Sequence, residues 1–181
     1  MHDCWTSYFG LKVGGHQICT AHLLRELKYL VKLYQQRWTE SFSGLLDGAL
    51  ELKKKMLAQE ALHDSKLVQE RKKLEEDLDR ILEKHIDQEH KKLIAFKKRI
   101  IRYRNYLFPF LYHLKVPPDN NASERAIRTC KVKQKVSGLF RSQEGANAFA
   151  IIRSVIDTTI KNTKNVWEAL AIIPTLAVVT E

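Results

Sequence analysis

The chain has 181 residues and a formal net charge of +10 at pH 7, and 44% of its residues are hydrophobic. This length and composition fit one globular domain with a buried core, and seven glycines and four prolines are too few for an all-β protein with many turns. Three widely spaced cysteines argue against a disulfide framework. No apolar run reaches the roughly 20 residues that a membrane-spanning helix needs.

The charge and the first residues bear on partners and location. A net positive charge favours a polyanionic partner, and nucleic acid is the first candidate. The start MHDCWTSYFG lacks the basic region and the apolar core of a secretory signal. We therefore expect a cytoplasmic protein without a membrane partner.

Residues 1–38 begin with a short alternation of apolar and polar residues, YFGLKVGGHQIC. Its two consecutive glycines predict a hairpin turn between two short strands. Apolar residues then recur at steps of three and four from Leu23 to Tyr34, which predicts a helix with one apolar face. Thr20 is placed to cap the start of that helix.

Residues 39–114 are helical in pattern almost throughout. Apolar positions at helical spacing run from Leu45 to Leu50, from Leu67 to Leu82 and from Leu93 to Leu107. Charged residues of both signs lie between them, as on solvated helix faces. The pattern predicts an all-helical insertion of two or three helices. A coiled-coil dimer is the alternative, although charged residues interrupt its heptads.

Residues 115–181 open with VPPDNNASERAIR, where Glu124 has two interpretations. Asn121 and Glu124 have the spacing of a capping box, and Arg128 lies four residues beyond Glu124, where the two side chains can pair on a helix. The other interpretation is a metal ligand, which requires a second carboxylate close in space. The residues by themselves favour the cap.

The stretch KVKQKVSGLF follows, with lysines at every second position. A period of two predicts a strand or an extended arm with Lys131, Lys133 and Lys135 on one face. Two helices then follow: Ser142 and Asn165 are placed as caps, and the last helix should stop before Pro174. The apolar residues Ala148, Phe149, Ile152, Val155, Ile156 and Ile160 are expected to form a buried stripe.

Two stretches together carry a family resemblance. They are HDCWTSYFGLKVGGHQICTAHLLRELKYL, from His2, and VPPDNNASERAIRTCKVKQKVSGLFRSQEGANAFAIIRSV, from Val116. Both resemble bacterial insertion-sequence transposases of the DDE class, of the insertion sequence sixty-six family. The resemblance implies an α/β fold that is predominantly helical: a partial ribonuclease-H-like core interrupted by an all-helical insertion. Residues 1–38 and 115–181 would belong to the core, and residues 39–114 to the insertion.

The resemblance also implies catalytic residues and a metal. Asp3 matches the second aspartate of the family's Asp-Asp-Glu triad, and Glu124, within DNNASER, matches the glutamate. The intact enzyme would use them to hold Mg²⁺ or Mn²⁺ while it cleaves and transfers DNA strands. Under this resemblance Glu124 is catalytic, and a capping role remains compatible with that.

DNA, at transposon ends and at the target, is the implied partner. The residues expected to contact its backbone are Arg125, Arg128, Lys131, Lys133, Lys135 and Arg141. A second basic cluster, from Lys97 to Arg104, lies in the insertion and is a candidate for flanking DNA. The segment CTAH resembles the Cys-x-x-His element of several DDE transposases, and we expect structural roles for Cys19, His22 and Asn121. A zinc site would need two further ligands.

The first aspartate of the triad would lie well upstream of Asp3. The chain therefore resembles the C-terminal part of a transposase, and we expect little or no strand cleavage from it alone. A non-catalytic DNA-binding remnant and a helical self-association module are the alternatives. A homo-oligomer acting in the bacterial cytoplasm, on nucleoid DNA, completes the expectation.

Overall fold

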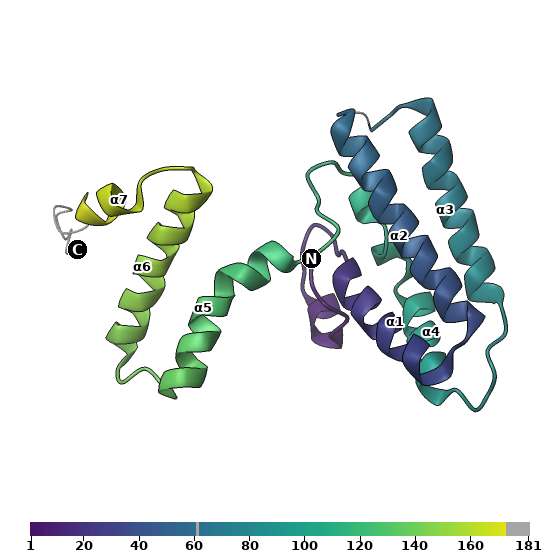
Figure 1. Cartoon of the computed structure of the whole chain (residues 1–181), viewed down its shortest axis with the longest axis horizontal. Coiled ribbons are helices and arrows are strands. Elements are labelled where there is room, and N and C mark those ends of the chain that lie inside the picture. Colours follow the sequence, from purple (N-terminus) through teal and green to yellow (C-terminus); the bar gives the residue numbers. More distant parts are fainter. Residues whose placement is uncertain (61, 173–181) are drawn as a thin grey trace. The chain divides into compact units, whose positions relative to one another are not determined.

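The chain folds into helices, and the computed structural model describes residues 1–60 and 62–172 of it. Two compact units divide the sequence, Met1–Asn121 and Ala122–Glu181. The described residues contain seven α-helices, which Figure 1 labels, so the expectation of a predominantly helical protein is confirmed. No helix in these ranges is both long enough and apolar enough to cross a membrane.

Four helices build the first unit. They are α1 (Thr20–Tyr34), α2 (Arg37–Ala58), α3 (Ser65–Glu83) and α4 (Lys91–Arg102). The first two predicted stretches of helical periodicity lie in α2 and α3, and the helical type predicted for them is correct. The third is correct only from Leu93 to Arg102, because α4 ends there and Leu107 lies beyond it. Asp64 starts α3 as an N-cap, because its carboxylate accepts hydrogen bonds from the amides of Lys66 and Leu67 at 2.9 and 3.1 Å.

The core of this unit lies where the apolar faces of the four helices meet. Phe42 of α2 and Phe96 of α4 are fully buried and contact each other edge to face, with ring centroids 5.9 Å apart. Trp38 stacks on Phe42 and donates its indole N–H to the carbonyl of Ile81 in α3, at 2.8 Å. Burial of these large side chains holds the helices together.

An irregular segment, residues 103–120, closes the unit and contains the short 3₁₀ turns η2 (Arg104–Tyr106) and η3 (Pro109–Leu111). Buried polar side chains fix it in place. The Gln17 amide donates to the carbonyl of Leu107 and accepts from the amide of Phe110, both at 3.0 Å. The Lys53 ammonium donates to the carbonyls of Phe110, His113 and Leu114 at 2.7 to 2.9 Å.

The predicted amino-terminal hairpin is wrong. Residues Thr6–Gly10 form a 3₁₀ helix, η1, and the described residues contain only an isolated parallel bridge, between His2 and Ile18. Phe9 stacks on Tyr103 with ring centroids 3.8 Å apart, so tertiary packing outweighs a short alternating pattern. Thr20 is not the cap either, because it is the first residue of α1 and Cys19 precedes it as N-cap without a side-chain bond.

The second unit consists of α5 (Asn121–Ser137), which begins on the last residue of the first unit, α6 (Gln143–Lys161) and α7 (Val166–Ile172). Both predicted caps are confirmed. Ser142 Oγ accepts from the amide of Gly145 at 3.1 Å, and Asn165 Oδ1 accepts from the amide of Trp167 at 2.9 Å. The expected stop at Pro174 lies outside the described residues.

The extended arm predicted over KVKQKV is wrong, because these residues are the second half of α5. The helix continues to Ser137 and is followed by Gly138 in the left-handed region (φ +71°), the conformation in which glycine commonly ends helices. Lysines have good helix propensity, and three exposed lysines are compatible with a helix surface as well as with a strand edge. A period of two over six residues was too short to separate the two structures.

The buried stripe predicted for α6 is also wrong. Ile152 and Ile160 are 45% and 56% exposed, and the second unit has a single buried residue among those described, Thr159. Phe149 is half-buried and contacts Phe140, with ring centroids 5.4 Å apart. The apolar face of α6 therefore exists as predicted from its spacing, but the described residues do not cover it.

Candidate active site

The candidate site is built around the two consecutive residues Cys19 and Thr20 at the start of α1. The amide of Cys19 donates to the carbonyl of His2 at 2.9 Å, and the amide of Thr20 donates to the carbonyl of Pro118 at 3.0 Å. The buried Cys19 thiol also accepts a hydrogen bond from the amide of Asn120, with a 3.3 Å N–S distance. The segment before Asp3 and the segment that leads into α5 are thus bound to neighbouring residues.

Asp3 directly follows the bridged residue His2. Its side chain is half-buried, and its Oδ1 accepts a hydrogen bond from the amide of Trp5 at 3.0 Å. Burial raises the pKa of the neighbouring Cys4 thiol to about 11, so this thiol is protonated at neutral pH. Hard divalent ions such as Mg²⁺ prefer carboxylate oxygen to sulfur, so the Asp3 carboxylate is the better donor for them at this point.

Glu124 lies in the first turn of α5 and is half-buried. The helix begins at Asn121 itself, one residue earlier than a cap at Asn121 would require, and the amide of Asn121 donates to Asp119 Oδ1 at 2.9 Å. Glu124 follows three residues later, about 4.5 Å farther along the helix axis. A carboxylate in a first turn is stabilised by the positive end of the helix dipole.

Because α5 is a helix, its basic residues lie on different faces of it. Arg128, Lys131 and Lys135 lie four, seven and eleven residues after Glu124, and this spacing puts all three on the Glu124 face. Two residues along a helix correspond to about 200° of rotation, so Lys133 points away from Lys131 and Lys135. Its ammonium donates to Ser137 Oγ at 3.1 Å. The six predicted DNA-contact residues therefore do not share one surface.

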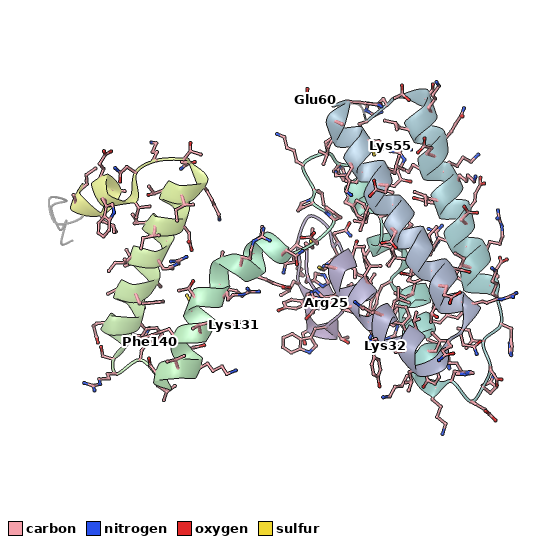
Figure 2. All side chains as sticks on the ribbon, viewed as in Figure 1. Arg25, Lys32, Lys55, Glu60, Lys131 and Phe140 are labelled. Carbon is pink, nitrogen blue, oxygen red and sulfur yellow. The ribbon has the colours of Figure 1, made fainter. Side chains whose placement is uncertain are left out.

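The other predicted contacts lie beside this face or beyond the helix. Arg125 is one residue from Glu124, about 100° around the helix, and is exposed. Arg141 follows Gly138 in the connection between α5 and α6 and is also exposed. Only Arg128, Lys131 and Lys135 are therefore aligned with Glu124 along α5; Figure 2 labels Lys131.

Cys19 and His22 both lie at the start of α1. Cys19 is fully buried, and the amide of His22 donates to the Cys19 carbonyl at 3.1 Å. Across residues 1–60 and 62–172, no group of three or more His, Cys, Asp and Glu side chains is arranged to hold a metal ion. Cys19 is therefore packed in the interior, and its thiol accepts a hydrogen bond from the segment before α5.

Two residues that position this site were missed by the sequence reasoning, Gln17 and Lys53. Lys53 belongs to the run KKK, which has the composition of a solvated surface. Its position along the helix could have predicted its burial, because Lys53 lies four residues after Ala49 and three before Met56, both fully buried. A lysine within an apolar stripe indicates a buried ammonium with backbone partners. Gln17 carried no comparable signal.

Comparison with known proteins gives the family. The sequence family described as Transposase IS66 family matches residues 1–148, which is most of the chain and includes Asp3, Cys19, Glu124 and the whole of α5. No curated protein and no solved structure gave a significant match. The match covers both segments that meet at Cys19 and Thr20, and we conclude that this chain belongs to the IS66 family of transposases.

Proposed function

We propose that this chain supplies part of the active site of a DDE transposase, which cleaves and transfers DNA strands during transposition. In this proposal Asp3 and Glu124 are the second and third acidic residues of the triad. The Glu124 face of α5 contacts the phosphodiester backbone beside the reacting bond. The family membership supports transposition as the process, and the contacts around Cys19 and Thr20 support these residues.

One observation carries the proposal more than any other. The carbonyls of His2 and Pro118 accept hydrogen bonds from consecutive amides, those of Cys19 and Thr20. Asp3 is one residue from the first of these anchors, and α5 begins three residues after the second. The two acids are 121 positions apart in sequence. The segment that precedes Asp3 and the segment that precedes α5 nevertheless accept hydrogen bonds from the same two consecutive residues, Cys19 and Thr20.

The donor chemistry of the two acids fits Mg²⁺ or Mn²⁺, because hard divalent ions prefer carboxylate oxygens. When bound, such ions activate the attacking oxygen and stabilise the leaving oxygen of a phosphodiester. Asp3 and Glu124 would hold them, and the Trp5 amide orients the Asp3 carboxylate through its hydrogen bond to Oδ1. Cys19 and Asn121 act indirectly, by fixing the segments that carry the acids.

The basic residues of α5 position the DNA. Arg128, Lys131 and Lys135 would neutralise backbone phosphates along the Glu124 face, and such contacts set the register of a duplex without reading its sequence. Arg125 and Arg141 extend this contact to either side. Lys133, which points away, contributes little.

Two acidic residues leave the triad incomplete within these 181 residues, so we propose that the chain by itself cleaves DNA weakly or not at all. The ribonuclease-H-like core, the assignment of residues 39–114 as its insertion, the assembly of several copies and action on nucleoid DNA in the bacterial cytoplasm belong to the same proposal. They rest on the family resemblance.

The helical face gives a direct test by fluorescence anisotropy with a labelled DNA duplex. Binding of the whole chain should weaken with salt, with a log–log slope of about −0.9 for each phosphate contact. Lys131→Ala and Lys135→Ala should each reduce that slope by about one contact. Lys133→Ala removes the same charge from the other side of the same helix and is the matched control.

An unchanged slope for Lys133→Ala beside reduced slopes for the other two variants supports the proposed face. Equal losses for all three lysines would point to the extended arm that the sequence suggested. No loss for Lys131→Ala or Lys135→Ala would refute the contact face of α5.

A further inference from the structure

Helices α1 and α4 lie side by side in the first unit, although 56 residues separate the end of one from the start of the other. Lys92 of α4 donates to the hydroxyl of Tyr29 in α1 at 2.8 Å, and its ammonium lies 5.1 Å from the centre of the Tyr29 ring. Arg99 of α4 pairs with Glu26 of α1. These contacts join two basic helices along one seam.

Each helix places its cations opposite its buried face. In α4 the buried residues are Leu93, Phe96 and Ile100, whereas Lys91, Lys98 and Arg102 are exposed at spacings of seven and four. In α1 the exposed cations are Arg25, Lys28 and Lys32, of which Figure 2 labels the first and last. Two cationic ridges therefore flank the Tyr29–Lys92 seam.

Acidic residues are nearly absent from these two helices. α4 has no acidic residue, and α1 has only Glu26, which Arg99 already neutralises. None of the six ridge cations forms an ion pair with any residue that the structure describes. By contrast, α3 carries six acidic residues, and several of them pair with cations, as Glu70 does with Lys55. The positive charge is thus concentrated on one pair of helices.

The structure also corrects the basic cluster expected from Lys97 to Arg104. Arg99 and Arg104 are occupied by Glu26 and Asp79, and the Lys97 ammonium donates to the carbonyl of Lys84 at 2.5 Å. Only Lys98 and Arg102 of that cluster remain outward and without an ion pair. The α1 ridge supplies further exposed cations, which were not part of the cluster predicted from the sequence.

We propose that these two ridges form a second duplex-DNA surface, which belongs to the first unit and binds backbone phosphates through cations other than those of α5. Cations that form no ion pair repel one another, and phosphates relieve that repulsion while releasing the counterions that surround DNA. The exposed cations repeat along both helices, and this spacing fits a repeating phosphate backbone better than a single small anion. The inference goes beyond the proposed function, because it requires neither Glu124 nor a metal ion.

Charge reversal on the whole chain tests this surface. Arg25→Glu/Lys32→Glu changes two exposed cations seven residues apart on α1. Lys66→Glu/Lys73→Glu changes two exposed cations seven residues apart on α3 and is the matched control. Duplex binding without divalent ions, measured by anisotropy over a salt series, should weaken about tenfold or more for the α1 variant, with a slope smaller by about two contacts. Lys98→Glu/Arg102→Glu should do the same.

Thermal melts monitored by circular dichroism show that each variant folds, and light scattering shows its mass. Equal weakening by the α3 control and the α1 variant would overturn the inference, since net charge alone would then explain binding. Unchanged DNA binding by both ridge variants would overturn it as well, even if the Lys131 and Lys135 variants still supported α5. A dimer that only the ridge variants dissociate, with DNA binding unchanged, would assign the ridges to a second copy of the chain instead.

Discussion

Lys53 occupies a position on α2 at which the helical period calls for an apolar side chain. It is 2% exposed, and its three ammonium donors match three carbonyl acceptors, those of Phe110, His113 and Leu114. The irregular segment that leads toward Pro118 and α5 is held by this one side chain and by Gln17. The Lys53 side chain thus connects α2 to the irregular segment that leads to the candidate site.

Replacing Lys53 with methionine should lower the free energy of unfolding by about 2–4 kcal/mol, because three buried carbonyls lose their donors while the apolar stem is kept. Urea denaturation monitored by circular dichroism measures this change. Lys54→Met is the matched control, since Lys54 is exposed and pairs with the exposed Glu51, and it should change stability by less than about 0.5 kcal/mol. Equal midpoints for the two variants would contradict the role given to Lys53.

At the scale of the element, α5 shows what a pattern can and cannot predict. The stretches that became α2, α3 and α4 have helical spacing over many turns, and their type was predicted because long periodic stretches have few alternatives. The six residues from Lys131 to Val136 fit both a strand and a helix. Their helical form became evident only from the continuous backbone that begins at Asn121. This form changes which lysines accompany Glu124.

The candidate site was predictable to a similar degree. Asp3 and Glu124 were proposed from a resemblance, because no local rule links two acids so far apart in sequence. Two of the contacts at Cys19 and Thr20 are made by main-chain groups, whose partners are His2 and Pro118, and main-chain groups leave no residue-specific signal. The third contact uses the Cys19 thiol, which accepts from the amide of Asn120. Packing of Phe9 on Tyr103, which removed the predicted hairpin, is likewise a contact between distant residues.

The helices of the two units should differ in local stability. α2 contributes nine buried residues to a shared core, whereas none of the residues of α5 is buried. Amides open more readily where few apolar contacts must be broken. Hydrogen exchange followed by mass spectrometry should therefore show exchange within minutes for peptides of α5 and protection for hours in the middle of α2. Comparable protection in both helices would show that α5 is covered in solution by a partner surface.

At the scale of the whole molecule, membership in the IS66 family and a charge of +10 both point to DNA. The positive charge is divided between two places, the Glu124 face of α5 and the ridges of α1 and α4. In our proposals, the first positions DNA at the reacting bond, and the second binds the duplex backbone without a metal ion. In the proposed function, the metal-dependent part requires Asp3 and Glu124 to act together.

Mn²⁺ line broadening in amide NMR spectra of the whole chain tests that joint action most directly, because it detects weak binding residue by residue. Signals from Asp3 and Glu124 should broaden together at the same low Mn²⁺ concentration, and Glu124→Gln should relieve the broadening at Asp3 as well as at residue 124. Asp3→Asn should have the reciprocal effect. If each carboxylate broadens independently of the other, or if Mn²⁺ affects neither segment, the two acids do not share a metal site.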